Sequence, residues 1–130
     1  MPLVITSRLA SGAVIVDMNG RLCLLDGAFR EHMTELLEEG HRAFVLNLAN
    51  VPYVDGFGLG QLIKIWTSVR CRGGQLILLR PTDRVQKLFR ITKLNTVFHI
   101  SAEETQAVKS VRRNVIGSAV RAIAAKTRLS

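Results

Sequence analysis

The feature that most constrains the fold is the stretch RAFVLNLANV at residues 42–51, in which almost every side chain is apolar. A strand with one solvated face alternates apolar and polar residues, whereas a strand buried on both faces is continuously apolar. Such strands occur in parallel sheets that are covered by helices on both faces. The stretch QLILLR at 75–80 is a second run of this kind. The sequence therefore predicts an α/β fold around a buried sheet.

Shorter patterns predict the remaining elements. The segments 3–10 and 13–20 are rich in β-branched residues and are separated by Ser11-Gly12, which indicates a hairpin. A last strand is expected at 96–100, and helices are expected at 25–40, at 57–72, after Pro81 and after Ser101. The predicted order is β-β-α-β-α-β-α-β-α, an α/β sandwich with a mixed central sheet.

Local signals predict how these helices begin and which face they bury. Asp26 is placed to cap the first helix, and Ser101 with Glu104 has the spacing of a capping box at the start of the last helix. The apolar stripe expected for the second helix consists of Leu59, Leu62, Ile63, Trp66 and Val69.

The charge is distributed unevenly along the chain. The net charge is +8, but residues 1–108 are nearly balanced, with 12 basic and 10 acidic side chains, and no acid follows Glu104. A near-neutral body argues against a nucleic-acid-binding domain, which presents a basic folded face. We therefore expect one domain at 1–112 and a basic C-terminal extension at 113–130. A frayed end, packing against the domain or a second copy, and binding to an acidic partner or membrane surface all remain open for the extension.

Catalytic and metal-binding patterns are absent from the sequence. Cys23 and Cys71 stand far apart without a Cys/His cluster, which argues against a zinc site or disulfides and favours a reducing cytoplasm. The three histidines are scattered, and no nucleophile, metalloprotease or paired-carboxylate motif is present. No apolar run approaches the ~20 residues of a membrane span, and no signal peptide is recognisable. We expect a cytoplasmic protein that is not an enzyme and has no metal or cofactor.

The six residues from Asp55 to Gly60, DGFGLG, lie between a predicted strand and a predicted helix. Their spacing is that of neither a dinucleotide fingerprint nor a P-loop, and the acid would repel a phosphate. The carboxylate of Asp55 is better placed to cap the helix, while the glycines permit positive φ and close backbone approach. Phe57 is either an exposed contact residue or a core residue, and the pattern favours neither.

Four blocks of the sequence form a collinear pattern: GRL at 20–22, FVLNLANVPYVDGFGLGQL at 44–62, GGQLILL at 73–79 and VQKLFRITKLNTVFHI at 85–100. This pattern resembles the STAS domain family of bacterial anti-sigma-factor antagonists. The resemblance implies a binding module that engages a kinase-type anti-sigma factor and so releases a sigma factor. In that family a serine in a D-S-S-G turn is phosphorylated, and the phosphate blocks binding.

The chain departs from that pattern at the turn itself. D-S-S-G aligns with residues 55–58, so Phe57 occupies the phosphoacceptor position and Gly56 that of the preceding serine. Cys23 and Asn47 stand where the family often has acids. We therefore expect partner binding without the serine switch, through Asp55, Gly56, Phe57, Gly58, Leu59 and Gln61. Two alternatives are a scaffold subunit of a sensory complex, with homo-oligomers built by the tail, and a nucleotide- or lipid-binding module.

Overall fold

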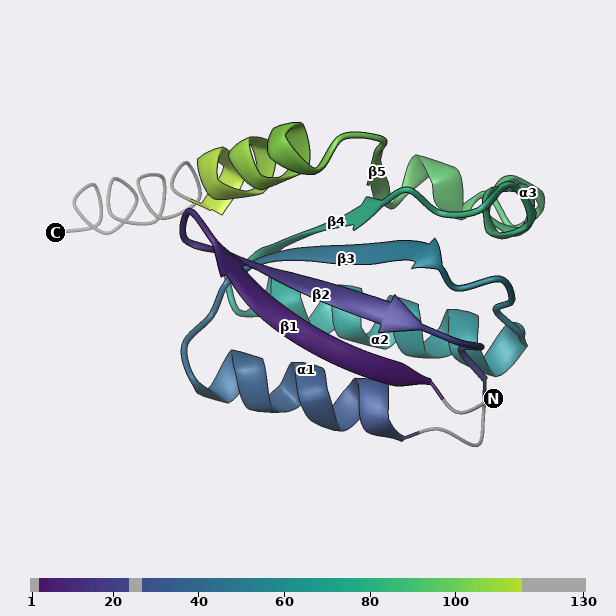
Figure 1. The fold of residues 1–130 in the computed structure, drawn as a ribbon, viewed down its shortest axis with the longest axis horizontal. Helices are drawn as coiled ribbons and strands as arrows, with labels where there is room; N and C mark the ends of the chain where they lie inside the picture. Colours follow the sequence, from purple (N-terminus) through teal and green to yellow (C-terminus); the bar gives the residue numbers. More distant parts are fainter. Residues whose placement is uncertain (1–2, 24–26, 116–130) are drawn as a thin grey trace, which may run out of the picture.

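The computed structural model describes residues 3–23 and 27–115. The elements are β1 (Val4–Ala10), β2 (Ala13–Asn19), α1 (Ala28–Glu38), β3 (Ala43–Asn50), α2 (Gly56–Cys71), β4 (Gln75–Leu79), α3 (Asp83–Ile91), a 3₁₀ turn η1 (Leu94–Thr96) and β5 (His99–Ser101). A C-terminal helix follows over residues 104–115 (Figure 1). The predicted order of strands and helices is confirmed, with ends displaced by at most three residues.

The five strands form one mixed sheet in the order β1-β2-β3-β4-β5. β1 pairs antiparallel with β2, while β2, β3, β4 and β5 pair in parallel. Ala10 pairs with Ala13, so the hairpin loop is the predicted Ser11-Gly12. Both loop residues have positive φ, at 51° and 89°, which matches the right-handed twist of the flanking strands.

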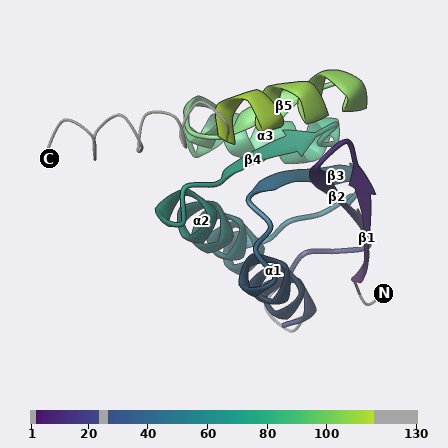
Figure 2. The same ribbon diagram turned by 90° about the vertical axis from the view of Figure 1, so that its left-hand side faces the viewer.

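Helices cover both faces of the sheet, as the continuous apolar strands required. α1 and α2 lie on one face, and the C-terminal helix lies on the other (Figure 2). In β3, Phe44, Leu46 and Leu48 pack toward the first face, while Ala43 and Val45 pack toward the second. The second face is covered by Ala107, Val108 and Val111 of the C-terminal helix. Burial on both sides is therefore why β3 carries no alternation.

The face that α2 buries differs from the predicted stripe at one position. Ile65 is 4% exposed and belongs to the core, whereas Ile63 is 38% exposed. Trp66 is half-buried at the edge of the core, where its ring meets that of Phe98 edge-on. Ile63 was therefore wrongly assigned to the stripe, because the pattern allowed two neighbouring rotations of the helix and packing on the sheet selected one.

The helix starts also differ from their predictions. Gly27 is the N-cap of α1, and Asp26, the predicted cap, lies outside the described residues. The predicted capping box at Ser101 is wrong, because Ser101 ends β5 and its hydroxyl contacts only the backbone of Glu103. The helix begins at residue 104, and the Glu104 carboxylate instead accepts hydrogen bonds from Arg8 on β1.

The same helix runs through residue 112, the expected domain boundary, and residues 116–130 lie outside the described chain.

Arg8 joins the C-terminal helix to the sheet through two carboxylates. Its guanidinium donates to Asp17 on β2 at 2.8 Å and to Glu104 at 3.3 Å, with a second, shorter bond to Glu104. Asn47 also donates to Asp17, at 2.7 Å. These hydrogen bonds from Arg8 lower the pKa of both carboxyl groups. A carboxyl group with a lowered pKa stabilises the fold above its ordinary pKa, and this stabilisation is lost as the pH falls through the folded value.

We expect Arg8→Gln to reduce the free energy of unfolding by about 1 kcal/mol at pH 7, a modest loss because the ion pairs are partly exposed. The difference in free energy of unfolding between the variant and wild type should decrease as the pH falls below about 4, because protonated carboxyl groups no longer form ion pairs with the guanidinium. Urea unfolding at pH 7 and pH 3 measures both values. An equal difference at the two pH values would contradict an ionic role for Arg8.

Candidate functional site at the start of helix α2

The turn that begins α2 is held against the segment that follows β2. Leu22 and Val54 form an isolated parallel bridge. The Leu22 amide donates to the Tyr53 carbonyl at 3.0 Å, and the Asp55 amide donates to the Leu22 carbonyl at 3.3 Å. Two segments that are separated by the whole of α1 and β3 therefore fix the corner from which the helix starts.

Asp55 is the N-cap of α2, as the sequence predicted. Its backbone is extended, with φ −90° and ψ −178°, and its carboxylate accepts a hydrogen bond from the Gly58 amide at 2.7 Å. The Leu59 amide donates to the Asp55 carbonyl at 2.8 Å and so begins the helical ladder. A carboxylate here satisfies one of the free N–H groups and opposes the positive end of the helix dipole. The Asp55 carboxylate therefore already provides a negative charge at this end of α2, which argues against a phosphate-binding site there.

The glycines of the turn do not have the role expected of them. Gly56, Gly58 and Gly60 all lie inside α2, and none is among the residues with positive φ, so the expectation of left-handed conformations is wrong. Only Gly58 needs to lack a side chain, because a Cβ there would lie 2.2 Å from the Leu22 carbonyl oxygen. A Cβ at Gly56 or Gly60 would meet nothing within 4 Å. Close approach is thus confirmed at one position of the three.

The structure separates the predicted partner-binding residues into exposed and buried ones. Phe57 is 62% exposed, which removes the alternative that it fills the core. Gly56 is exposed beside it, whereas Gly58 and Leu59 are buried beneath the turn. Gln61 is half-buried, and its amide donates to the Cys23 carbonyl at 3.1 Å. Direct contact with a partner is therefore open to Gly56 and Phe57, while Gly58 and Leu59 support the turn from below.

Basic and aromatic residues that the sequence analysis did not single out surround this turn. The guanidinium groups of Arg21 and Arg84 lie 5.9 Å and 5.1 Å from the centre of the Tyr53 ring. A shallow hollow of about 360 Å³ runs from the turn to α3, and Arg84 and Ile91 are among its lining residues. Ile91 is 69% exposed.

The near-neutral charge of the body conceals this local excess of cations. Residues 56–93 contain eight Lys or Arg residues and one acid, Asp83, whereas α1 carries Glu31, Glu35 and Glu38. A charge count per predicted element, in place of one over residues 1–108, would have found the segregation. Acidic side chains thus outnumber basic ones in α1 and basic side chains outnumber acidic ones from α2 to α3, and the turn belongs to the basic part.

The described part of the chain offers no metal centre and no membrane span. Within residues 3–23 and 27–115, no group of three His, Cys, Asp or Glu side chains is arranged to hold a metal ion. None of the helices in these ranges is both long enough and apolar enough to cross a bilayer.

Comparison with known proteins identifies the family that matches this chain. The STAS domain family matches residues 5–107. A protein assigned as an anti-sigma factor antagonist in Thermotoga maritima is 30% identical over 79 residues, which are 61% of this chain and 70% of that protein. The anti-sigma-B factor antagonist of Staphylococcus aureus is 32% identical over 71 residues, which are 55% of this chain and 66% of that protein. A crystal structure of a Thermotoga maritima protein assigned as an anti-sigma factor antagonist superposes with a TM-score of 0.76 at 24% identity, covering 83% of this chain and 94% of that one.

Proposed function

The chain belongs to the STAS domain family, and we propose that it is a regulatory binding module that engages a kinase-type anti-sigma factor through the start of α2. The relatives named as anti-sigma factor antagonists support a regulatory role. The observation that carries the proposal is the exposure of Phe57, at 62%, on a turn held rigidly by the Asp55 cap and the Leu22 bridge. A large exposed apolar side chain on a rigid support is a typical anchor of a protein interface.

The surroundings of Phe57 indicate the chemistry of the partner surface. Gly56 adds no side chain beside the ring, so the ring is accessible from the first turn of the helix. Arg21, Arg84 and Lys87 lie at or near the same corner and are all exposed. A matching partner surface would have an apolar pocket for the ring, bordered by carboxylates. Such complementary charges raise the association rate and select against wrong partners.

Binding to the partner tests the proposal directly. The chain should bind a kinase-type anti-sigma factor from the same organism and displace its sigma factor, which gel filtration of the three-component mixture can show. The affinity should fall as salt is raised from 50 to 500 mM, because exposed charges at the interface are screened. An anti-sigma factor that keeps its sigma factor at saturating concentrations of this chain would exclude the antagonist role.

The turn is proposed to work without the serine switch. Tyr53 is the only hydroxyl-bearing residue in 53–62, and its ring is half-buried beside two guanidinium groups. Incubation with the partner kinase and ATP should leave residues 53–62 unmodified in mass spectrometry. The variant Phe57→Ser should accept phosphate under the same conditions, because it places a hydroxyl on the exposed first turn. Phosphate on Tyr53 of the wild-type protein would contradict the prediction.

A further inference from the structure

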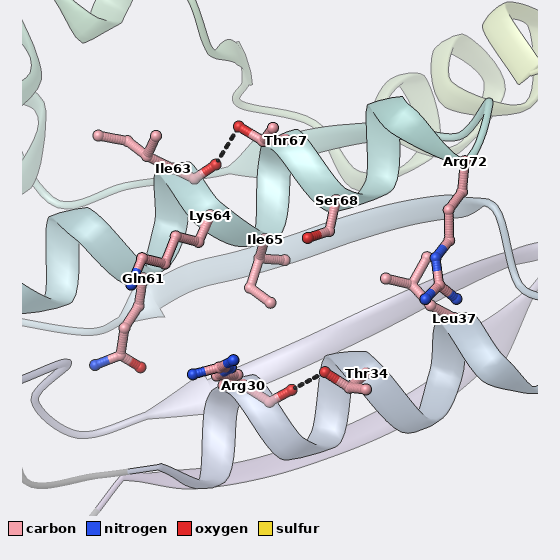
Figure 3. A pocket seen from close by; sticks show the side chains of 10 residues that line it. All are labelled: Arg30, Thr34, Leu37, Gln61, Ile63, Lys64, Ile65, Thr67, Ser68 and Arg72. Carbon is pink, nitrogen blue, oxygen red and sulfur yellow. Dashed lines mark hydrogen bonds between the residues drawn. The ribbon is translucent and has the colours of Figure 1, made fainter.

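A groove between α1 and α2 is separate from the exposed Phe57 anchor and has no role in the proposed partner binding. It measures about 450 Å³, which is within the range of ~300 to 1,000 Å³ typical of small-molecule sites. Arg30 lies at the end near the start of α1, and Arg72 lies at the opposite end beside Leu37, with Ile65 between the helices (Figure 3). The lining along α2 runs from Gln61 to Arg72, eleven positions apart, so the groove is roughly 16 Å long.

The charge of the groove is unbalanced. Arg30, Lys64 and Arg72 line it, and among the described residues that form its walls none is Asp or Glu. None of these three cations forms an ion pair within residues 3–23 and 27–115, although α1 carries three glutamates. Cations on facing helices repel one another, which would be relieved by an anion between them.

Polar groups that can bind an anion or its substituents accompany the cations. The hydroxyl groups of Thr34 and Ser68 lie along the walls. The Gln61 side chain lines the groove near Arg30, where its Nε2 donates to the Cys23 carbonyl at 3.1 Å. Its Oε1 is buried and lacks a hydrogen-bond partner in the described part of the chain. Buried acceptors without a partner are rare in folded proteins, and the enclosure of this atom leaves the wall hydroxyl groups as the side-chain acceptors that a ligand in the groove can reach.

We propose that the α1/α2 groove binds a phosphorylated small molecule that also carries a hydroxyl or amino donor. Arginine forks, a lysine and a serine hydroxyl are the groups that bind phosphate oxygens. The phosphate would lie beside the Arg72 guanidinium, with Ser68 on the same wall of α2, while Lys64 extends toward Gln61 at the other end of the groove (Figure 3). The ligand's carbon skeleton would cover Ile65 and Leu37, and its hydroxyl or amino donor would face the Thr34 hydroxyl on the opposite wall. A free phosphate ester and the headgroup of an anionic lipid share this chemistry.

Titration of the full-length protein with defined probes tests the site by NMR. Glucose 6-phosphate is the main probe, glucose and inorganic phosphate separate the two halves of the ligand, and phosphatidylglycerol vesicles represent the lipid source. We expect glucose 6-phosphate to shift amide signals of residues 30–37 and 61–72 with saturation, and to bind more tightly than inorganic phosphate. Glucose alone should bind at least about tenfold more weakly, because it lacks the charge-assisted hydrogen bonds.

Matched variants decide whether the groove itself is responsible. Arg72→Gln should weaken glucose 6-phosphate binding about tenfold, and Ser68→Asp should abolish it by placing a carboxylate in the groove. Arg90→Gln removes the same charge from an exposed residue of α3 outside the groove and should bind as wild type does. Circular dichroism and thermal melting of each variant verify folding.

Three outcomes would overturn the proposal. They are an absence of saturable shifts with glucose 6-phosphate, inorganic phosphate and the vesicles alike, an equal loss of binding in Arg72→Gln and Arg90→Gln, and binding of glucose as tight as that of glucose 6-phosphate. None of these results bears on the partner surface, because Arg72 and Ser68 lie at the opposite end of α2 from Phe57. Failure of the groove and failure of the proposed partner binding are therefore distinguishable.

Discussion

Replacing Gly58 by alanine is expected to reduce the free energy of unfolding by about 3 kcal/mol, the cost of forcing an extra methyl group into a packed site. The new Cβ would lie 2.2 Å from the carbonyl oxygen and 2.8 Å from the carbonyl carbon of Leu22. Those atoms are backbone and cannot rotate away, and the same carbonyl accepts the Asp55 amide. The turn could accept alanine only by separating from the Leu22 bridge. Thermal unfolding should show a decrease in Tm of about 10 °C.

Gly60→Ala is the matched control, because it makes the same chemical change two residues further along the same helix. A Cβ at Gly60 meets nothing within 4 Å. Alanine has a higher helix propensity than glycine, so this variant should be more stable than wild type by roughly 0.5–1 kcal/mol. Equal stability changes for the two substitutions would show that close packing on Leu22 does not determine the requirement for glycine.

Phe57→Asp is expected to weaken partner binding by more than about a hundredfold, as the loss of a central aromatic anchor does. The substitution removes the exposed ring and places a carboxylate against the proposed acidic border of the partner. Because Phe57 is 62% exposed, the fold itself should lose little stability. Isothermal titration with the purified anti-sigma factor measures the affinity, and thermal unfolding verifies the fold.

Leu9→Asp provides the control for that experiment. Leu9 is an apolar residue that is 72% exposed. It lies next to the β1–β2 hairpin loop, at the end of the sheet opposite the start of α2 (Figure 1). Its substitution should leave the affinity unchanged. A Phe57→Asp variant that binds as tightly as Leu9→Asp would refute the assignment of the α2 turn as the interface.

The order of strands and helices could be predicted from the sequence because the faces that each element buries determine the spacing of its apolar residues. The run at 42–51 is apolar at nearly every position since β3 is covered on both faces. The Ser11-Gly12 loop could also be predicted, because a two-residue hairpin loop needs residues that tolerate positive φ. Asp55 was recognised as a cap for a similarly local reason, since the atom it binds lies only three residues away.

The groove between α1 and α2 could not be predicted from the sequence. Arg30 and Arg72 are 42 positions apart in the chain, and only the side-by-side packing of α1 and α2 places them at two ends of one groove. Local periodicity states that each helix has an exposed side, but it does not state which exposed sides face each other. The orphan acceptor of Gln61 is likewise a consequence of burial between elements.

The sequence by itself determined the α/β class, the order of elements, the hairpin and the cap of α2, because each depends on residues within a few positions of one another. Tertiary structure alone decided why Gly58 must be glycine, since the atom it must avoid belongs to Leu22. It also decided the role of Glu104, which had the spacing of a capping residue but pairs with Arg8, 96 positions away. Local propensities state what a residue can do, and contacts between distant segments select which of those interactions forms.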